Sequence, residues 1–101
     1  AAVVDGKIYV SGGFAASGET LDALEAYDPV TDTWTTLASL SRARERHASA
    51  VINGKLYVFG GYSAASADLM DLVEVYSPAS DSWASAADLL LPIVEVVAVA
   101  L

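Results

Sequence analysis

Short apolar runs alternate with polar turn residues along much of the chain, a pattern typical of short β-strands. The runs AAVV and SAVI end at Asp5-Gly6 and Asn53-Gly54. Such dipeptides are strong signals for a β-hairpin, because both central positions of a type I′ turn need positive φ. The expected strand pairs are residues 1–4 with residues 7–11, and residues 47–52 with residues 55–59.

Two segments of the sequence occur a second time in closely similar form. GKIYVSGG at residues 6–13 returns as GKLYVFGG at residues 54–61, 48 positions later. LDALEAYDPVTDTW at residues 21–34 returns as MDLVEVYSPASDSW at residues 70–83, 49 positions later. The extra residue falls in an Ala- and Ser-rich segment, where a surface loop tolerates an insertion. Repetition at such a long period indicates an architecture built from repeated units.

Each repeat carries signals for two further strands. A loop of 7–9 residues follows each Gly-Gly pair, and third strands are expected near residues 23–27 and 72–76. DPVTDT and SPASDS then supply the residues of a tight turn, and fourth strands start at Trp34 and Trp83. We therefore expect four antiparallel strands in each repeat. Helices are the alternative for the Ala- and Leu-rich residues 21–26 and 64–76, but the hairpin signals and the repeat register favour strands.

A four-stranded unit of about fifty residues with Gly-Gly after its second strand resembles a kelch repeat. The linking segment SLSRARERHASAVINGKLYVFGG also carries the Arg-x-x-His-Ala pattern of the family, at Arg44, His47 and Ala48. The resemblance implies an all-β fold: four-stranded antiparallel blades of a kelch-type β-propeller, two blades plus one extra terminal strand. The structural motif residues that carry the resemblance are Gly12, Gly13, Tyr27, Trp34, His47, Gly60, Gly61, Tyr76 and Trp83.

The resemblance implies a first blade at residues 1–46, with a truncated first strand, and a second blade at residues 47–90. Residues 91–101 are expected to form an extra strand that completes another blade or pairs with a partner chain. The sequence departs from the family pattern here, since Glu95 and Val96 stand where Arg46 and His47 are expected. Propellers close with about four to eight blades, so we expect that the chain is part of a longer protein, assembles with copies of itself, or docks on other chains.

Composition and charge narrow the classes of partner. The chain is 54% hydrophobic and 18% charged, so it is not a disordered segment. Its net charge of −8 disfavours nucleic acid and anionic membranes as partners. The absence of cysteine excludes disulfides and thiolate metal sites, and is compatible with a reducing compartment such as the cytoplasm. The apolar run at residues 89–101 is too short to span a bilayer and is interpreted as a buried strand.

The residues that carry reactive groups offer little support for catalysis. His47 is the single histidine, which gives little support to a metal triad or to a Ser-His-Asp triad. Among kelch repeats, the equivalent position has a structural role where the chain enters a blade. Glu25 and Glu74 match between the repeats, as do Asp32 and Asp81, because the repeat itself recurs. We therefore expect no catalytic residue, no metal site and no cofactor.

Candidate binding residues lie in the loops. Arg42, Arg44 and Arg46 are three of the five basic residues, and their i, i+2, i+4 spacing directs side chains of an extended segment to the same side. By strand alternation their segment emerges on the same rim as the loops after each Gly-Gly. In propellers that this sequence resembles, that rim is the partner-binding surface, and arginines there suit an acidic peptide or a carboxylate. The alternative is that they pair with Glu45, Asp68 or Asp71, or are solvated. Phe14 and Tyr62 follow the glycine pairs directly, and either contact a partner or pack under their own loops.

The function expected from the resemblance is a non-catalytic binding module that presents its rim loops to a protein or peptide. Two alternatives remain open. The chain is a fragment of a kelch-propeller enzyme of the oxidase or sugar isomerase type, or it is a structural or designed repeat unit that self-assembles.

Overall fold

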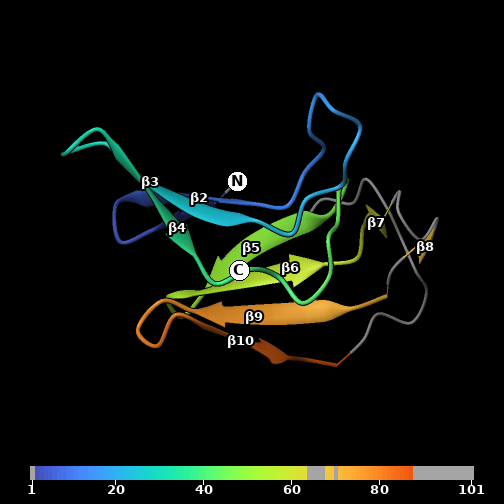
Figure 1. The fold of residues 1–101 in the computed structure, drawn as a ribbon. Helices are drawn as coiled ribbons and strands as arrows, with labels where there is room; N and C mark the ends of the chain where they lie inside the picture. Colours follow the sequence, from blue (N-terminus) through green and yellow to red (C-terminus); the bar gives the residue numbers. More distant parts are fainter. Residues whose placement is uncertain (1, 64–67, 70, 88–101) are drawn as a thin grey trace.

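A computed structural model describes residues 2–63, 68–69 and 71–87, and the secondary structure of these residues is all β. Two four-stranded antiparallel sheets have the strand orders β1-β2-β3-β4 and β10-β9-β6-β5, and β7 and β8 form a separate hairpin (Figure 1). The strands are β1 (Ala2–Val4), β2 (Lys7–Ser11), β3 (Leu24–Asp28), β4 (Thr33–Leu37), β5 (Ala48–Ile52), β6 (Lys55–Phe59), β7 (Tyr62–Ser63), β8 (Asp68–Leu69), β9 (Val73–Ser77) and β10 (Ser82–Ser85).

The prediction of two four-stranded antiparallel units is confirmed. We call β1–β4 the first blade and β5, β6, β9 and β10 the second blade. Strands rather than helices occupy Leu24–Asp28 and Val73–Ser77. The extra strand expected at residues 91–101 lies outside the described residues. The described part of the chain contains no helix that is long and apolar enough to cross a membrane.

The two predicted hairpin turns form as the sequence indicates. Asp5 and Gly6 have φ of 48° and 75°, and Asn53 and Gly54 have φ of 52° and 73°. These positive values suit a type I′ turn, whose twist matches that of the flanking strands. The turns set the strand registers, with Val4 opposite Lys7 and Ile52 opposite Lys55.

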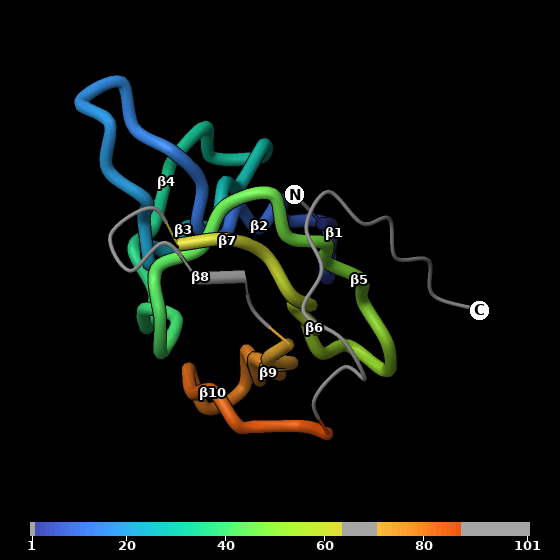
Figure 2. Tube along the Cα trace, turned by 90° about the vertical axis from the view of Figure 1, so that its right-hand side faces the viewer, coloured from blue at the N-terminus to red at the C-terminus, as the bar shows by residue number. Residues whose placement is uncertain are grey.

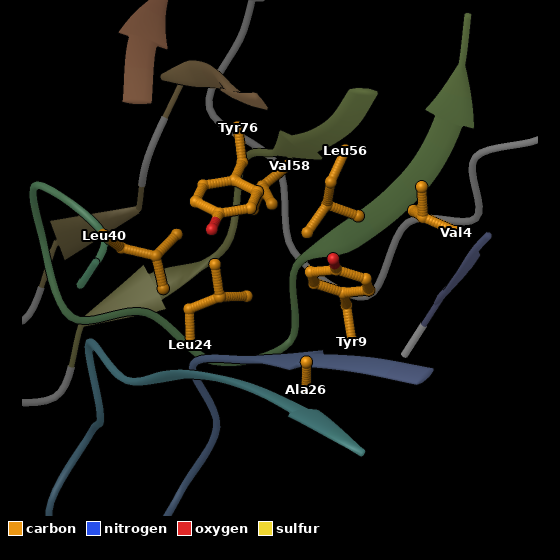
Figure 3. Packing of buried hydrophobic residues seen from close by; sticks show 8 residues of the cluster. All are labelled: Val4, Tyr9, Leu24, Ala26, Leu40, Leu56, Val58 and Tyr76. Atoms are coloured by element: carbon orange, nitrogen blue, oxygen red, sulfur yellow. The ribbon is translucent and has the colours of Figure 1, made fainter. Parts of the chain in front are cut away.

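The hydrophobic core lies between the two blades. Buried side chains of the first blade and of the segment after it meet buried side chains of the second blade in a single cluster (Figure 3). Tyr9 and Tyr76, one from each blade, have ring centroids 6.1 Å apart. A sheet is stabilised by burying its apolar face against another element, so each blade here depends on its neighbour. The cluster contains Val4, Tyr9, Leu24, Ala26, Leu40, Leu56, Val58 and Tyr76.

The ends of the strands form two different rims (Figure 1). At one end, on the left of the figure, lie the four short connections β1–β2, β3–β4, β5–β6 and β9–β10, which we call the tight-turn rim. The segment of residues 38–47, which we call the linker, joins the two blades. At the other end of the strands lie residues 12–23, the described residues between β6 and β9, and the end of the linker. We call this end the loop rim. It carries the candidate binding residues.

Candidate functional site

The linker holds the two halves of the loop rim together. Its residue Arg44 donates its backbone N–H to the Leu21 carbonyl at 3.0 Å and accepts from Gly13 N–H at 2.8 Å. Its next residue, Glu45, exchanges two backbone hydrogen bonds of 2.9 Å with Tyr62. The linker therefore runs between the loop of the first blade and β7 of the second, where Glu45 forms a β-bridge with Tyr62, as Figure 2 shows from the loop-rim side.

Arg44 is fully buried, with 0% of its surface exposed. Its guanidinium donates to the carbonyls of Gly60 at 3.0 Å and Leu72 at 3.3 Å, and forms a short charged hydrogen bond with Glu74. The other carboxylate oxygen of Glu74 accepts from the Ser41 N–H at 3.2 Å. Burial lowers the pKa of Arg44, and the negative charge of Glu74 acts against this shift.

His47 completes the contact between the blades. Its Nε2 lies 3.0 Å from the Ser11 hydroxyl of the first blade. Burial lowers the pKa of His47 to about 4, and the nearby positive charge of Arg44 acts in the same direction. The imidazole is therefore neutral at pH 7 and joins two blades through a neutral hydrogen bond. This arrangement supports a structural role for His47.

The Gly-Gly pairs leave room for this linker. A Cβ on Gly12 would lie 2.4 Å from the Arg44 carbonyl oxygen, and a Cβ on Gly61 would lie 2.9 Å from the Glu45 carbonyl oxygen. Both glycines also have positive φ, of 58° and 108°. Only glycine combines this backbone conformation with such close approach of another chain segment. The Gly-Gly motif therefore lets the linker backbone approach both blades closely, and this places Arg44 inside the molecule.

The three arginines do not point the same way, so the expectation drawn from their alternation is wrong. Arg44 points inward, whereas Arg42 and Arg46 are exposed. The physical reason is that the linker is not uniformly extended, since it bends at residues 41, 42 and 46 and Arg46 has a positive φ of 55°. Buried partners in the second blade then hold the Arg44 side chain. The suggested ion pairs were only partly right. Arg46 Nε lies 4.0 Å from the Glu45 carboxylate, but the partner of Arg44 is Glu74.

The loop rim combines aromatic, polar and charged groups from both blades, some of them exposed and some buried. The Arg46 guanidinium carbon lies 5.9 Å from the centre of the Tyr62 ring, within the range of a cation–π contact. The Thr20 hydroxyl of the first blade donates to the Glu45 carboxylate at 3.1 Å. Phe14 is 57% exposed, and its backbone forms a β-bridge with Thr20. The rim residues Phe14, Thr20, Glu45, Arg46 and Tyr62 are hereafter the rim cluster.

Sequence reasoning found three members of this cluster and missed two. Phe14, Arg46 and Tyr62 were selected because they follow the glycine pairs or carry positive charge. Glu45 and Thr20 were not selected as contact residues, and nothing in their local sequence distinguishes them from other loop residues. The Glu74 side chain was attributed to the recurrence of the repeat, and its buried partnership with Arg44 was not foreseen.

Outside the rim cluster, the described residues bring few reactive side chains together. Within residues 2–63, 68–69 and 71–87, no group of three or more His, Asp or Glu side chains is placed to hold a metal ion. The repeated Tyr and Asp residues bond each other: the Tyr27 hydroxyl donates to Asp32 at 2.5 Å, and the Tyr76 hydroxyl donates to Asp81 at 2.6 Å. These carboxylates therefore hold the turns between the third and fourth strands of each blade.

Comparison with known proteins agrees with this architecture. The sequence profile of the Kelch motif matches residues 1–41 and 43–90. The solved structure of YjhT superposes with a TM-score of 0.68 at 21% identity, over 85% of this chain and 36% of that one. The fold is thus that of two blades of a kelch-type β-propeller. The chain belongs to the kelch-repeat family.

Relatives at higher identity are much longer proteins. An F-box/kelch-repeat protein of Arabidopsis thaliana is 50% identical over 62 residues, which cover 61% of this chain and 16% of the relative. The mouse (Mus musculus) homologue of an influenza virus NS1A-binding protein is 43% identical over 68 residues, which cover 67% of this chain and 10% of the relative. The matched region is therefore a small part of each relative.

Proposed function

We propose that the chain is a non-catalytic binding module that presents its loop rim to a protein or an acidic peptide. The observation that carries this proposal is the rim cluster: an exposed Phe14 and an arginine over an aromatic ring project from a rim whose backbone is held by the buried Arg44. Exposed aromatic and arginine side chains on a fixed backbone are typical of residues that dominate protein interfaces.

The relatives support a protein partner. One of them is named as a homologue of a protein that binds an influenza virus protein. The chemistry of the rim favours an acidic ligand, because an arginine guanidinium pairs with a carboxylate through two parallel hydrogen bonds. Arg42 lies exposed in the same linker and extends the basic part of the rim. The partly buried, neutral His47 makes no such contribution.

A charge-matched pair of variants tests the proposal. Peptides are selected from a random library on the immobilised chain, and their affinities are measured by isothermal titration calorimetry. Arg46→Glu on the loop rim and Lys55→Glu at the tight-turn rim change the net charge equally. We expect selected peptides to be rich in Asp and Glu, to lose about tenfold or more in affinity with Arg46→Glu, and to keep their affinity with Lys55→Glu.

Phe14→Ala provides a second test that does not depend on charge. We expect a loss of about tenfold in affinity for the same peptides, because an exposed aromatic side chain contributes apolar contact area to a partner. Equal losses in Arg46→Glu and Lys55→Glu, with no loss in Phe14→Ala, would show that the loop rim is not the binding surface.

A further inference from the structure

The tight turn between β5 and β6 holds a side chain that the proposed function does not use. Asn53 is the only asparagine of the sequence, which contains no glutamine, so it carries the single side-chain amide of the chain. Asn53 and Gly54 are both exposed, and their φ values of 52° and 73° suit a type I′ turn. Asparagine is a thermolabile residue, and the fate of its amide depends on the residue that follows it.

Gly54 places an accessible backbone nitrogen next to this amide. The strand ladder closes with Ile52 opposite Lys55, so the N–H of Gly54 lies outside the ladder. A Cβ added to Gly54 would meet no atom within 4 Å, so the space beside its main chain is open. Glycine also has no side chain that would shield its own nitrogen. The turn therefore combines an exposed amide and an accessible nitrogen in adjacent residues.

The first blade contains the same turn with an acid in place of the amide. Asp5 and Gly6 have φ of 48° and 75°, close to the values at Asn53 and Gly54. Val4 stands opposite Lys7, which is the register of the β5–β6 turn. An aspartate therefore fits this turn as well as an asparagine does.

We propose that Asn53-Gly54 is a site of spontaneous deamidation whose two products differ in whether they keep the β5–β6 hairpin. The Gly54 backbone nitrogen attacks Cγ of Asn53, and the new C–N bond closes a succinimide ring. The bond from Cγ to the side-chain nitrogen breaks, and that nitrogen leaves as ammonia with the proton of the Gly54 amide. Water then opens the ring. Cleavage between the ring nitrogen and Cγ gives aspartate, and cleavage between the ring nitrogen and the main-chain carbonyl carbon gives isoaspartate.

The aspartate product keeps the hairpin, because it reproduces the Asp5-Gly6 turn of the first blade. It adds one negative charge at the tight-turn rim to a chain whose net charge is already −8. The reaction consumes only water and needs no partner. This inference concerns the rim opposite the candidate binding surface, so it does not depend on the proposed function.

The isoaspartate product does not fit the turn. Its main chain passes through Cβ and Cγ, so it is longer by one methylene group, whereas a type I′ turn joins its strands with two ordinary residues. Leu56 and Val58 follow the turn and are 1% and 0% exposed in the core between the blades. A disturbed register moves such side chains out of the core. Isoaspartate is therefore expected to destabilise the second blade.

Incubation of the chain at mildly alkaline pH, where a backbone amide loses its proton more easily, tests the reaction. Intact mass and isoelectric focusing measure the loss of the amide, and a peptide of residues 48–59 gives the reference rate. We expect the chain to convert at Asn53, several-fold more slowly than the peptide, because the hairpin restrains the backbone while the ring closes. A chain that keeps its amide while the peptide is fully converted would overturn the proposal.

Two variants assign the reaction to the Asn-Gly turn. Asp5→Asn gives the first blade the same dipeptide and is expected to add a second converting site. Ser80→Asn places an amide in the exposed turn between β9 and β10, where Asp81 follows instead of glycine, and this amide is expected to persist over the same period. Equal conversion at positions 53 and 80, or none at position 5, would also overturn the proposal.

Thermal denaturation tests the difference between the two products. An endoproteinase that cleaves before aspartate but not before isoaspartate measures both products in the acidic fraction of the aged chain. We expect Asn53→Asp to melt with the wild type, and the fraction that contains isoaspartate to show a further transition at lower temperature. Early melting of Asn53→Asp, or wild-type melting of the whole isoaspartate-containing fraction, would contradict the predicted effect on the hairpin.

Discussion

The two blades repeat the same residues, yet their equivalent faces lie in different environments. Tyr76 is fully buried, and Glu74 is buried against Arg44. In the first blade Tyr27 and Glu25 are partly exposed, and Trp34 is largely exposed. The ring geometry is nearly identical in both blades. The repeated kelch residues lie in the same four-stranded sheet in both blades. Among the described residues, the aromatic side chains of the motif join the core only in the second blade, where a neighbouring blade packs on that face, so these residues serve the contact between blades.

The largest effect is expected from removing the aromatic ring from each face. Tyr76→Ala leaves a cavity between the blades and is expected to lower the free energy of unfolding by about 4 kcal/mol. Tyr27→Ala removes a partly exposed ring and is expected to lower it by less than about 1 kcal/mol. Urea denaturation monitored by circular dichroism measures both values. Similar losses in the two variants would mean that the two faces do not differ as described.

Glu25 and Glu74 occupy equivalent positions of the two blades, so removing the charge of each compares the two environments. Glu74→Gln leaves the buried Arg44 guanidinium without a negative partner, and we expect a loss of about 3 kcal/mol in the free energy of unfolding. Glu25→Gln is expected to change it by no more than about 0.5 kcal/mol. The same denaturation measurement applies. A neutral effect of Glu74→Gln would argue that its ion pair with Arg44 does not stabilise the contact.

His47 makes the contact between the blades sensitive to acid. Its pKa is lowered to about 4 in the folded chain, below the ordinary value of about 6.5, so the unfolded chain binds more protons between these values. Stability is therefore retained above about pH 6.5 and lost as the pH falls towards about 4, by about 3 kcal/mol in total. Denaturation at about pH 7 and about pH 4.5 measures this loss. His47→Gln is the control, and an equal loss in that variant would remove His47 as the cause.

The smallest effect is expected from single hydrogen bonds. Trp83→Phe removes the indole N–H that donates to the Ala38 carbonyl, and we expect a loss of about 1 kcal/mol. Trp34→Phe is expected to cost close to nothing, because Trp34 is 57% exposed. Thermal denaturation of the two variants gives the difference. A larger loss for Trp34→Phe than for Trp83→Phe would contradict the assignment of Trp34 as the more exposed of the two tryptophans.

Local sequence signals predicted most of the strands. Asp5-Gly6 and Asn53-Gly54 fix their hairpins because few residues accept their positive φ, and the repeat transfers the assignment from one blade to the other. The short β7–β8 hairpin was not predicted, since two-residue strands carry no periodic pattern.

The orientation of Arg44 was not predictable from its spacing. Its inward direction depends on hydrogen-bond partners in the second blade and on glycines that approach the linker from distant parts of the sequence. Nor did the repeat predict that Tyr27 and Tyr76 differ in burial. Equivalent residues share local structure, but burial is set by the neighbouring blade.

The exposure of the two tryptophans tests the central comparison most directly. Variants Trp83→Phe and Trp34→Phe each retain one tryptophan, and acrylamide quenching of its fluorescence in the dilute, monomeric chain reports its access to solvent. We predict that Trp34 emits at longer wavelength and is quenched several-fold more efficiently than Trp83. Equal quenching of both residues would contradict the account, because it would show that the first blade does not cover the second.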